Sequence, residues 1–323
     1  MKTERKIILF LLLVPPLMGE FATGNKINLL FNPFALFIFY TMSLLLYGCG
    51  TLIIRELRTR WKLQWSVVFL LIAYGIFEEG FMTKAFFNPD WAGVAPFQDY
   101  GMYWGVQWPW AIGVTFTHAT FSTLLAIVMS DYIWPEYRNK PLLGKIGWFF
   151  ALLGFLGIGI LGSLTMGNSE IGGDPFIPDP VLIPATIIVI ASLVVLAYLL
   201  KWSKLKSKAK VHSPFYFGLV AFLMQAFFLL SGLFVPAVDA PTMLVIYAVV
   251  LLLAFFFMKR QIYNVNATPR HITALVFGTI LFFVALLPLQ LVQGKVAMAG
   301  LLPIVLILAW LWRRNVLKRT PAA

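Results

Sequence analysis

The sequence has only one cysteine, Cys49, and few charged residues. A single cysteine excludes a disulfide within the chain, and we expect Cys49 to be a small packing residue. Charged residues make up 12% of the 323 positions and hydrophobic residues 60%, whereas a soluble domain carries about a quarter charged residues. The composition therefore excludes an ordinary soluble globular protein.

Long polar segments are missing as well. No stretch between the apolar runs is long enough to fold as a soluble catalytic domain. We therefore predict that residues 1–323 form a single integral membrane domain with no soluble domain. Any chemistry must then take place inside the helical bundle or at its rim.

Apolar runs dominate what is present. Each is long enough to cross ~30 Å of hydrocarbon, because a helix rises ~1.5 Å per residue. The runs predict an all-α fold, a polytopic transmembrane helical bundle of about ten spans. These spans lie near residues 7–23, 33–54, 65–82, 108–129, 146–166, 181–200, 214–235, 242–258, 272–290 and 296–312.

The net charge of +12 is distributed asymmetrically. With the N-terminus in the cytoplasm, every lysine and arginine except Lys26, Lys84 and Lys295 falls on the cytoplasmic side. This pattern follows the positive-inside rule, so we predict that the N- and C-termini are both cytoplasmic. Because the basic residues are divided among short segments, we expect membrane lipids as partners and no nucleic acid.

The first 23 residues also resemble a secretory signal peptide, with basic residues followed by an apolar run. No A-x-A cleavage site follows, and Pro15 and Pro16 interrupt the run. We favour a retained first helix. Cleavage would leave the same orientation, so topology does not decide whether residues 1–23 are retained or cleaved.

Two adjacent glutamates, Glu78 and Glu79, lie near the end of the third predicted span. Ionisable side chains inside a span are costly and usually line the interior of the bundle. Helix rise places Glu78 and Glu20 each ~20 Å from the inner boundary, and His118 ~15 Å below the outer one. These heights agree to about one helical turn. They permit a common site, and His118 is the one histidine inside a predicted span.

The faces of these helices add detail. Adjacent residues diverge by about 100° around a helix, so Glu78 and Glu79 cannot point equally at one spot. We expect one glutamate to face a cavity and the other to be satisfied by the backbone or by Lys84. Thr115, His118 and Ser122 are spaced by three and four residues, so they form a polar seam along the fourth span.

Other polar residues have plainer interpretations. Gln225 lies at a central depth and is a further candidate for the interior. We expect Arg55 and Glu56, after the second span, and Asp131 and Glu136, after the fourth, to face water.

Three further patterns leave alternatives open. Glycines between residues 147 and 162 favour tight helix packing or a hinged helix. The aromatic segment 97–110 is typical of an interfacial belt, or of a lid over a cavity. The motif F-N-P occurs at 31–33 and 87–89, each time after an acidic residue, which indicates either a tandem repeat of helical pairs or coincidence.

The stretches E-E-G-F-M-T-K from Glu78 and T-H-A-T-F-S around His118 resemble the CAAX-protease and bacteriocin-processing family of intramembrane metalloproteases. That family carries E-E-x-x-x-R on one helix, F-x-x-x-H on the next and a later H-x-x-x-N. The resemblance implies metal or general-base roles for Glu78, Glu79 and His118. Thr83 and Val114 stand at the arginine and phenylalanine positions. Because depth adds Glu20, the candidate ligands of a divalent metal such as zinc are Glu79, His118 and Glu20.

The segment 74–91, YGIFEEGFMTKAFFNPDW, also resembles uncharacterised bacterial multi-pass membrane proteins. That resemblance implies a cell-membrane location of the bacterial inner-membrane type and no particular activity. Three classes of function stay open: a metal-dependent intramembrane protease or hydrolase, a proton- or cation-coupled transporter, and an accessory structural subunit.

Overall fold

A computed structural model of the chain describes residues 2–21, 32–94, 96–167, 170–171, 175–202, 206–235 and 237–292. It is all-helical apart from two short hairpins, β1 (Met102–Tyr103) with β2 (Val106–Gln107) and β3 (Met166–Gly167) with β4 (Glu170–Ile171). The α-helices are α1 (Thr3–Pro16), α2 (Pro33–Ser43), α3 (Cys49–Trp61), α4 (Val67–Ile76), α5 (Trp108–Thr117), α6 (Leu125–Ile133), α7 (Lys145–Thr165), α8 (Leu182–Leu199), α9 (Pro214–Leu230), α10 (Ala240–Phe257) and α11 (Pro269–Val292).

Seven continuous helices in the described part of the chain are long and apolar enough to cross a membrane. They correspond to the second and to the fourth through ninth predicted spans, and they confirm a multi-pass membrane protein. The first and third predicted spans are helical as well, in α1 and α4 with the turns that extend them, but they are not among these seven. The tenth, at 296–312, lies outside the described residues, so the number of ten spans stays a prediction.

The helices begin where the sequence provides capping groups. Asn32 accepts a hydrogen bond from the backbone N–H of Ala35 (3.1 Å) just before α2, and Asp239 accepts one from Thr242 (3.0 Å) before α10. Each of these two helices has a proline in its first turn. A side-chain acceptor followed by proline satisfies free N–H groups and fixes the first helical φ. These caps therefore fix where the second and eighth spans start.

The two F-N-P motifs have different structures. Asn32 and Pro33 start a helix, whereas Asn88 accepts from the backbone N–H of Asp90 (3.0 Å) within a turn, and α5 begins only at Trp108. The motif itself therefore does not mark equivalent helix starts in the two pairs.

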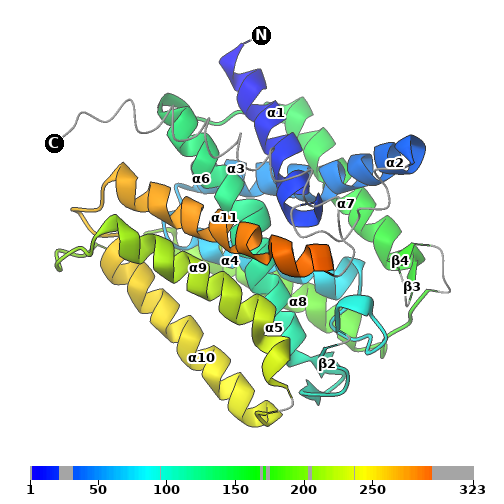
Figure 1. Cartoon of the computed structure of the whole chain (residues 1–323). Helices are drawn as coiled ribbons and strands as arrows, with labels where there is room; N and C mark the ends of the chain where they lie inside the picture. Colours follow the sequence, from blue (N-terminus) through cyan, green and yellow to red (C-terminus); the bar gives the residue numbers. More distant parts are fainter. Residues whose placement is uncertain are drawn as a thin grey trace.

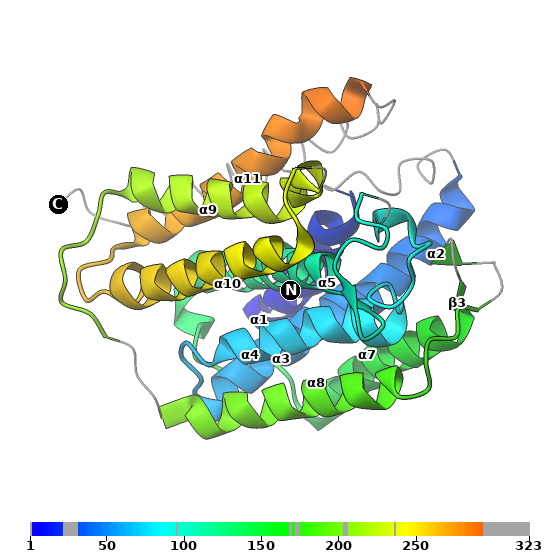
Figure 2. The same ribbon diagram turned by 90° about the horizontal axis from the view of Figure 1, so that it is seen from below.

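Helix α4 lies inside the bundle. It packs against α8, α5 and the helical turn that joins α5 to α6. Figure 1 shows the helices from one face, and Figure 2, turned by 90°, shows α9, α10 and α11 on one side of the N-terminal helices and α8 on the other. Helices α8 and α10 expose most of their apolar side chains, as expected of surfaces that face lipid. The polar side chains of the candidate site consequently lie in the N-terminal part of the bundle.

The glycines of α7 allow the segment that carries the two glutamates to approach closely. A Cβ built on Gly159 would lie within 2.2 Å of the Phe77 ring, and one on Gly162 within 2.5 Å of Met82. Small residues let membrane helices pack tightly, which confirms the packing interpretation at these two positions. A Cβ on Gly157, in the same helix, would meet nothing within 4 Å.

We expect Gly159→Ala to destabilise the protein by about 1–3 kcal/mol, because Phe77 is stacked on Phe155 at 4.3 Å and has little room to move. Thermal unfolding in detergent measures the effect. Gly157→Ala is the matched control and should be neutral or slightly stabilising, since alanine favours helix. Equal stabilities of the two variants would contradict the packing described here.

Candidate functional site

Four helical turns of the π type meet around the candidate residues. They are η1 (Leu17–Phe21), η3 (Leu44–Gly48), η4 (Phe77–Met82) and η6 (His118–Leu124). The turns join or extend α1, α2 and α3, α4, and α5 and α6, and η6 contacts both η1 and α4. Single π turns are rare and frequent at functional sites, because the extra residue redirects side chains.

Each of these turns contributes a polar side chain. Glu20 comes from η1, Tyr47 from η3, Glu78 and Glu79 from η4, and His118 from η6. The first and second helical pairs are therefore alike in one respect: the first helix of each ends in a π turn that bears glutamate. This local likeness supports the tandem-repeat hypothesis more directly than the F-N-P motifs do.

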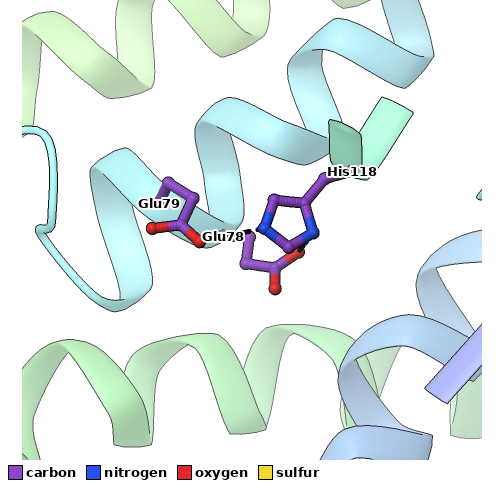
Figure 3. Close-up of side chains that lie close together, drawn as sticks. All are labelled: Glu78, Glu79 and His118. Carbon is purple, nitrogen blue, oxygen red and sulfur yellow. Dashed lines mark hydrogen bonds and ion pairs between the residues drawn. The ribbon is translucent and has the colours of Figure 1, made fainter. Parts of the chain in front are cut away.

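Glu78, Glu79 and His118 form a buried trio, which Figure 3 shows as one imidazole between two carboxylates. The His118 Nε2 and Glu79 Oε1 atoms are 2.9 Å apart, and His118 Nδ1 and Glu78 Oε2 are 3.2 Å apart. One ligand atom from each residue lies within 4.8 Å of the other two. The structure thus brings together all three residues to which the sequence assigns catalytic roles.

The prediction that one glutamate faces a cavity while the other is satisfied by the backbone or by Lys84 is wrong. Both approach His118, because an imidazole has a nitrogen on each of two edges and two diverging carboxylates can bracket one ring. Lys84 does not pair with either glutamate. Its ammonium group donates to the carbonyl oxygens of Ser163 (2.8 Å) and Phe176 (2.7 Å), and so it fastens the loop after η4 to the end of α7.

The contacts of Glu79 and Glu78 bear on the tautomer of the His118 ring. Glu79 uses both carboxylate oxygens, Oε1 toward His118 Nε2 and Oε2 as acceptor from the Thr83 hydroxyl (3.2 Å). An ionised carboxylate only accepts, so an ionised Glu79 pairs with a ring that carries hydrogen on Nε2; in the neutral form of that tautomer Nδ1 presents its lone pair. His118 Nδ1 and Glu78 Oε2 are buried and have no hydrogen-bond partner, despite their 3.2 Å separation.

Tyr47 extends the trio toward α1. Its ring centroid lies 5.8 Å from that of His118, and its hydroxyl donates to Glu20 Oε1 (3.0 Å). Glu20 is only partly buried, whereas Tyr47 is 2% exposed. The sequence analysis did not select Tyr47. Its position in the second span, at a depth comparable with that of His118, is the feature of the sequence that could have identified Tyr47 as a site residue.

The polar seam of the fourth span is buried, as its spacing predicts. Thr115, His118 and Ser122 are all buried. Gln225 is buried too, but its amide donates to the Thr120 hydroxyl (2.7 Å), on a neighbouring face of η6. Gln225 therefore joins α9 to η6, and its hydrogen bond does not reach the trio.

A second buried polar cluster lies where α3 and α6 end, and here the expectation of solvent exposure is wrong. Arg55, Glu56 and Asp131 are 1%, 0% and 5% exposed. The Arg55 guanidinium donates to Glu56 and to the carbonyl oxygens of Tyr137 and Lys140, while both nitrogens of the Arg58 fork donate to Asp131. Only Glu136, of the four residues expected to face water, is exposed. The arginines hold the loop after α6 against α3.

A separate cavity of about 530 Å³ lies beside the β1–β2 hairpin. Its lining residues are Tyr103, Trp104, Trp108, Ile112, Pro241 and Leu244. None belongs to the trio. The aromatic segment 97–110 thus borders an open apolar groove between α5 and the start of α10, and Trp104 at the hairpin turn is 88% exposed.

These features define a multi-pass helical membrane protein with a buried cluster of two carboxylates and one imidazole. Residues 8–319 match an uncharacterized membrane protein family, and the chain belongs to that family. No curated protein and no solved structure matches the chain. The comparisons support the resemblance to uncharacterised multi-pass proteins and give no support to the resemblance to CAAX proteases.

Proposed function

We propose that this protein binds one divalent metal ion, such as zinc, at the trio and acts as an intramembrane metal-dependent hydrolase or protease. The observation that carries the proposal is the pair formed by His118 Nδ1 and Glu78 Oε2. Both atoms are buried and 3.2 Å apart; they form an ion pair when the ring is protonated, and neither makes a hydrogen bond. Two ligands bound at 2.0–2.1 Å to a tetrahedral zinc lie roughly 3.3 Å apart, so the spacing fits a shared ion.

The assignment of roles follows from the hydrogen bonds. His118 Nδ1 and Glu78 would hold the metal directly. Glu79 would bind His118 and not the metal. A carboxylate that accepts from the second N–H of a ligand histidine fixes the tautomer and the orientation of its ring. The sequence-based ligand set of Glu79, His118 and Glu20 is thereby refined. Glu20 is held by Tyr47 and stays a candidate for a further ligand at the partly exposed edge of the site.

Charge balance also favours a cation. Two carboxylates in an apolar bundle are costly unless a positive charge offsets them. Among the described residues, no lysine or arginine is paired with Glu78 or Glu79, and Lys84 is bonded to carbonyl oxygens. Their basic partner is His118, whose ring offsets at most one of the two negative charges. A divalent ion would neutralise the pair.

A zinc ion in such a site supplies Lewis acidity and an activated water at neutral pH. The protein would contribute a dry surrounding, a fixed imidazole and a second carboxylate suited to accept a proton. Hydrolysis inside the bundle implies a substrate that reaches it through the membrane, a peptide segment or a lipid.

Proton- or cation-coupled transport is a second candidate. It is favoured by the link from the trio through Tyr47 to Glu20 on a different helix, since intramembrane acidic and histidine residues are typical of relays and ion sites. We also propose that both termini face the cytoplasm, in a bacterial inner membrane. The basic residues at the ends of α3, α6, α8 and α10 support that orientation.

We expect the purified protein to contain about one divalent metal per chain, measured by elemental analysis after preparation without chelator or metal-affinity resin. Replacement by cobalt should give the visible absorption of an ion bound by nitrogen and oxygen in a site of low symmetry. Wild type that neither retains zinc nor takes up cobalt would exclude the hydrolase and leave transport or an accessory role.

A further inference from the structure

Buried polar side chains also lie between the trio and the second polar cluster, along the interface of α3 with η6 and α6. At one end the Tyr47 and His118 rings are 5.8 Å apart. At the other end Arg58 binds Asp131 through both nitrogens of its fork. Residue numbers rise in the same direction on both helices, so the helices run parallel. Arg58 is eleven residues after Tyr47, so the two positions are about 16 Å apart along the helix axis.

Hydroxyl side chains lie between these two ends. Thr51 follows Tyr47 by four residues and Ser122 follows His118 by four, so each continues the face of the residue above it. Thr51 is 0% and Ser122 1% exposed. The Ser122 hydroxyl also faces η1, because it lies 3.0 Å from the place of a Cβ on Gly19.

Neither hydroxyl has a hydrogen-bond partner, and neither does that of the buried Thr123. Most helical serines and threonines here donate to the carbonyl one turn earlier, as Thr59, Thr117, Thr120, Thr186, Ser192 and Thr273 do. Thr51 and Ser122 do not use this default bond. Buried polar groups that lack protein partners are generally satisfied by ordered water.

We propose that Thr51 and Ser122 line a narrow hydrated path that leads from the end of the bundle bearing Arg58 and Asp131 to the buried trio. The two hydroxyls lie one turn below the paired rings of Tyr47 and His118 and offer donors and acceptors there, as a file of waters requires. That this water is the nucleophile for hydrolysis rests on the proposed function. The path itself does not, because it follows from the hydroxyls and the packing of α3 on α6.

Cysteine accessibility tests the path. In a Cys49→Ala background, single Thr51→Cys and Ser122→Cys variants are treated with a small, charged, thiol-specific reagent in reconstituted vesicles. Thiols react as thiolates, which need water, so we expect both to react at least roughly 10-fold faster than the Ile127→Cys control. Ile127 lies on the opposite face of the same helix from His118, is 1% exposed and belongs to an apolar cluster. Reaction should be faster from the side that bears Arg58.

A second measurement needs no substitution in the path. Radiolytic hydroxyl radicals oxidise side chains beside bound water, so Tyr47 should be modified and Tyr247 spared. Both tyrosines are buried, but the Tyr247 hydroxyl is bonded to Ser231 within an apolar cluster. Unreactive cysteines in folded variants, together with equal oxidation of the two tyrosines, would overturn the path. Metal-free protein with reactive cysteines would instead overturn the proposed function alone.

Discussion

His118→Ala and Glu78→Gln are each expected to abolish metal binding, whereas Glu79→Gln retains the metal with affinity lowered about 10- to 100-fold. The first change removes His118 Nδ1, and the second replaces the anionic Glu78 carboxylate with a neutral amide, which is a poor metal ligand. The third replaces a group whose two oxygens are already bonded, to His118 and to Thr83. Metal content and competition with a chelator of known affinity measure the difference.

His271→Ala is the matched control for the loss of an imidazole. His271 is also buried, 7% exposed, and its nitrogens are bonded to Thr268 and to the carbonyl oxygen of His212. This variant is expected to keep its metal. If Glu79→Gln lost the ion completely while Glu78→Gln kept it, the two glutamates would have the reverse roles. If all four variants kept the metal, the trio would not be the binding site.

The sequence predicts the helical class and the residues of the trio because both depend on local features. Apolar runs of spanning length are read directly from the chain, and a glutamate pair and a histidine inside such runs are conspicuous by their cost. Helix rise alone gave them compatible depths. The meeting of Glu78 and Glu79 at one ring was not predictable, because it depends on π turns for which the sequence gives no clear signal.

The second polar cluster was missed for a different reason. Arg55, Glu56 and Asp131 stand at the ends of apolar runs, where a charge that faces water and a charge that is paired have the same sequence pattern. Their burial depends on the loop after α6, whose carbonyl oxygens at Tyr137 and Lys140 accept from Arg55. That contact joins positions more than 80 residues apart in the chain, beyond the reach of any local pattern.

Asp131→Ala is expected to destabilise the protein by about 3 kcal/mol, the lower end of the range for breaking a buried ion pair, since the Arg58 side chain is 14% exposed. The variant removes both carboxylate acceptors of the Arg58 fork, leaves it the carbonyl oxygen of Arg138 (3.2 Å), and weakens the hold of α3 on α6. Thermal or denaturant unfolding in detergent measures the loss. Glu136→Ala, at an exposed position five residues later, should change stability by no more than about 0.5 kcal/mol.

A double variant separates the attraction within the pair from the cost of an unpaired charge. Replacing both partners of a buried pair with apolar residues often leaves stability unchanged, whereas removing one partner leaves an unpaired charge in the apolar interior. Arg58→Met with Asp131→Leu is therefore expected to recover much of the stability that Asp131→Ala loses. A double variant as unstable as the single one would show that the pair itself holds α3 to α6. Unchanged stability in Asp131→Ala would mean that the carbonyl contacts of Arg55 suffice.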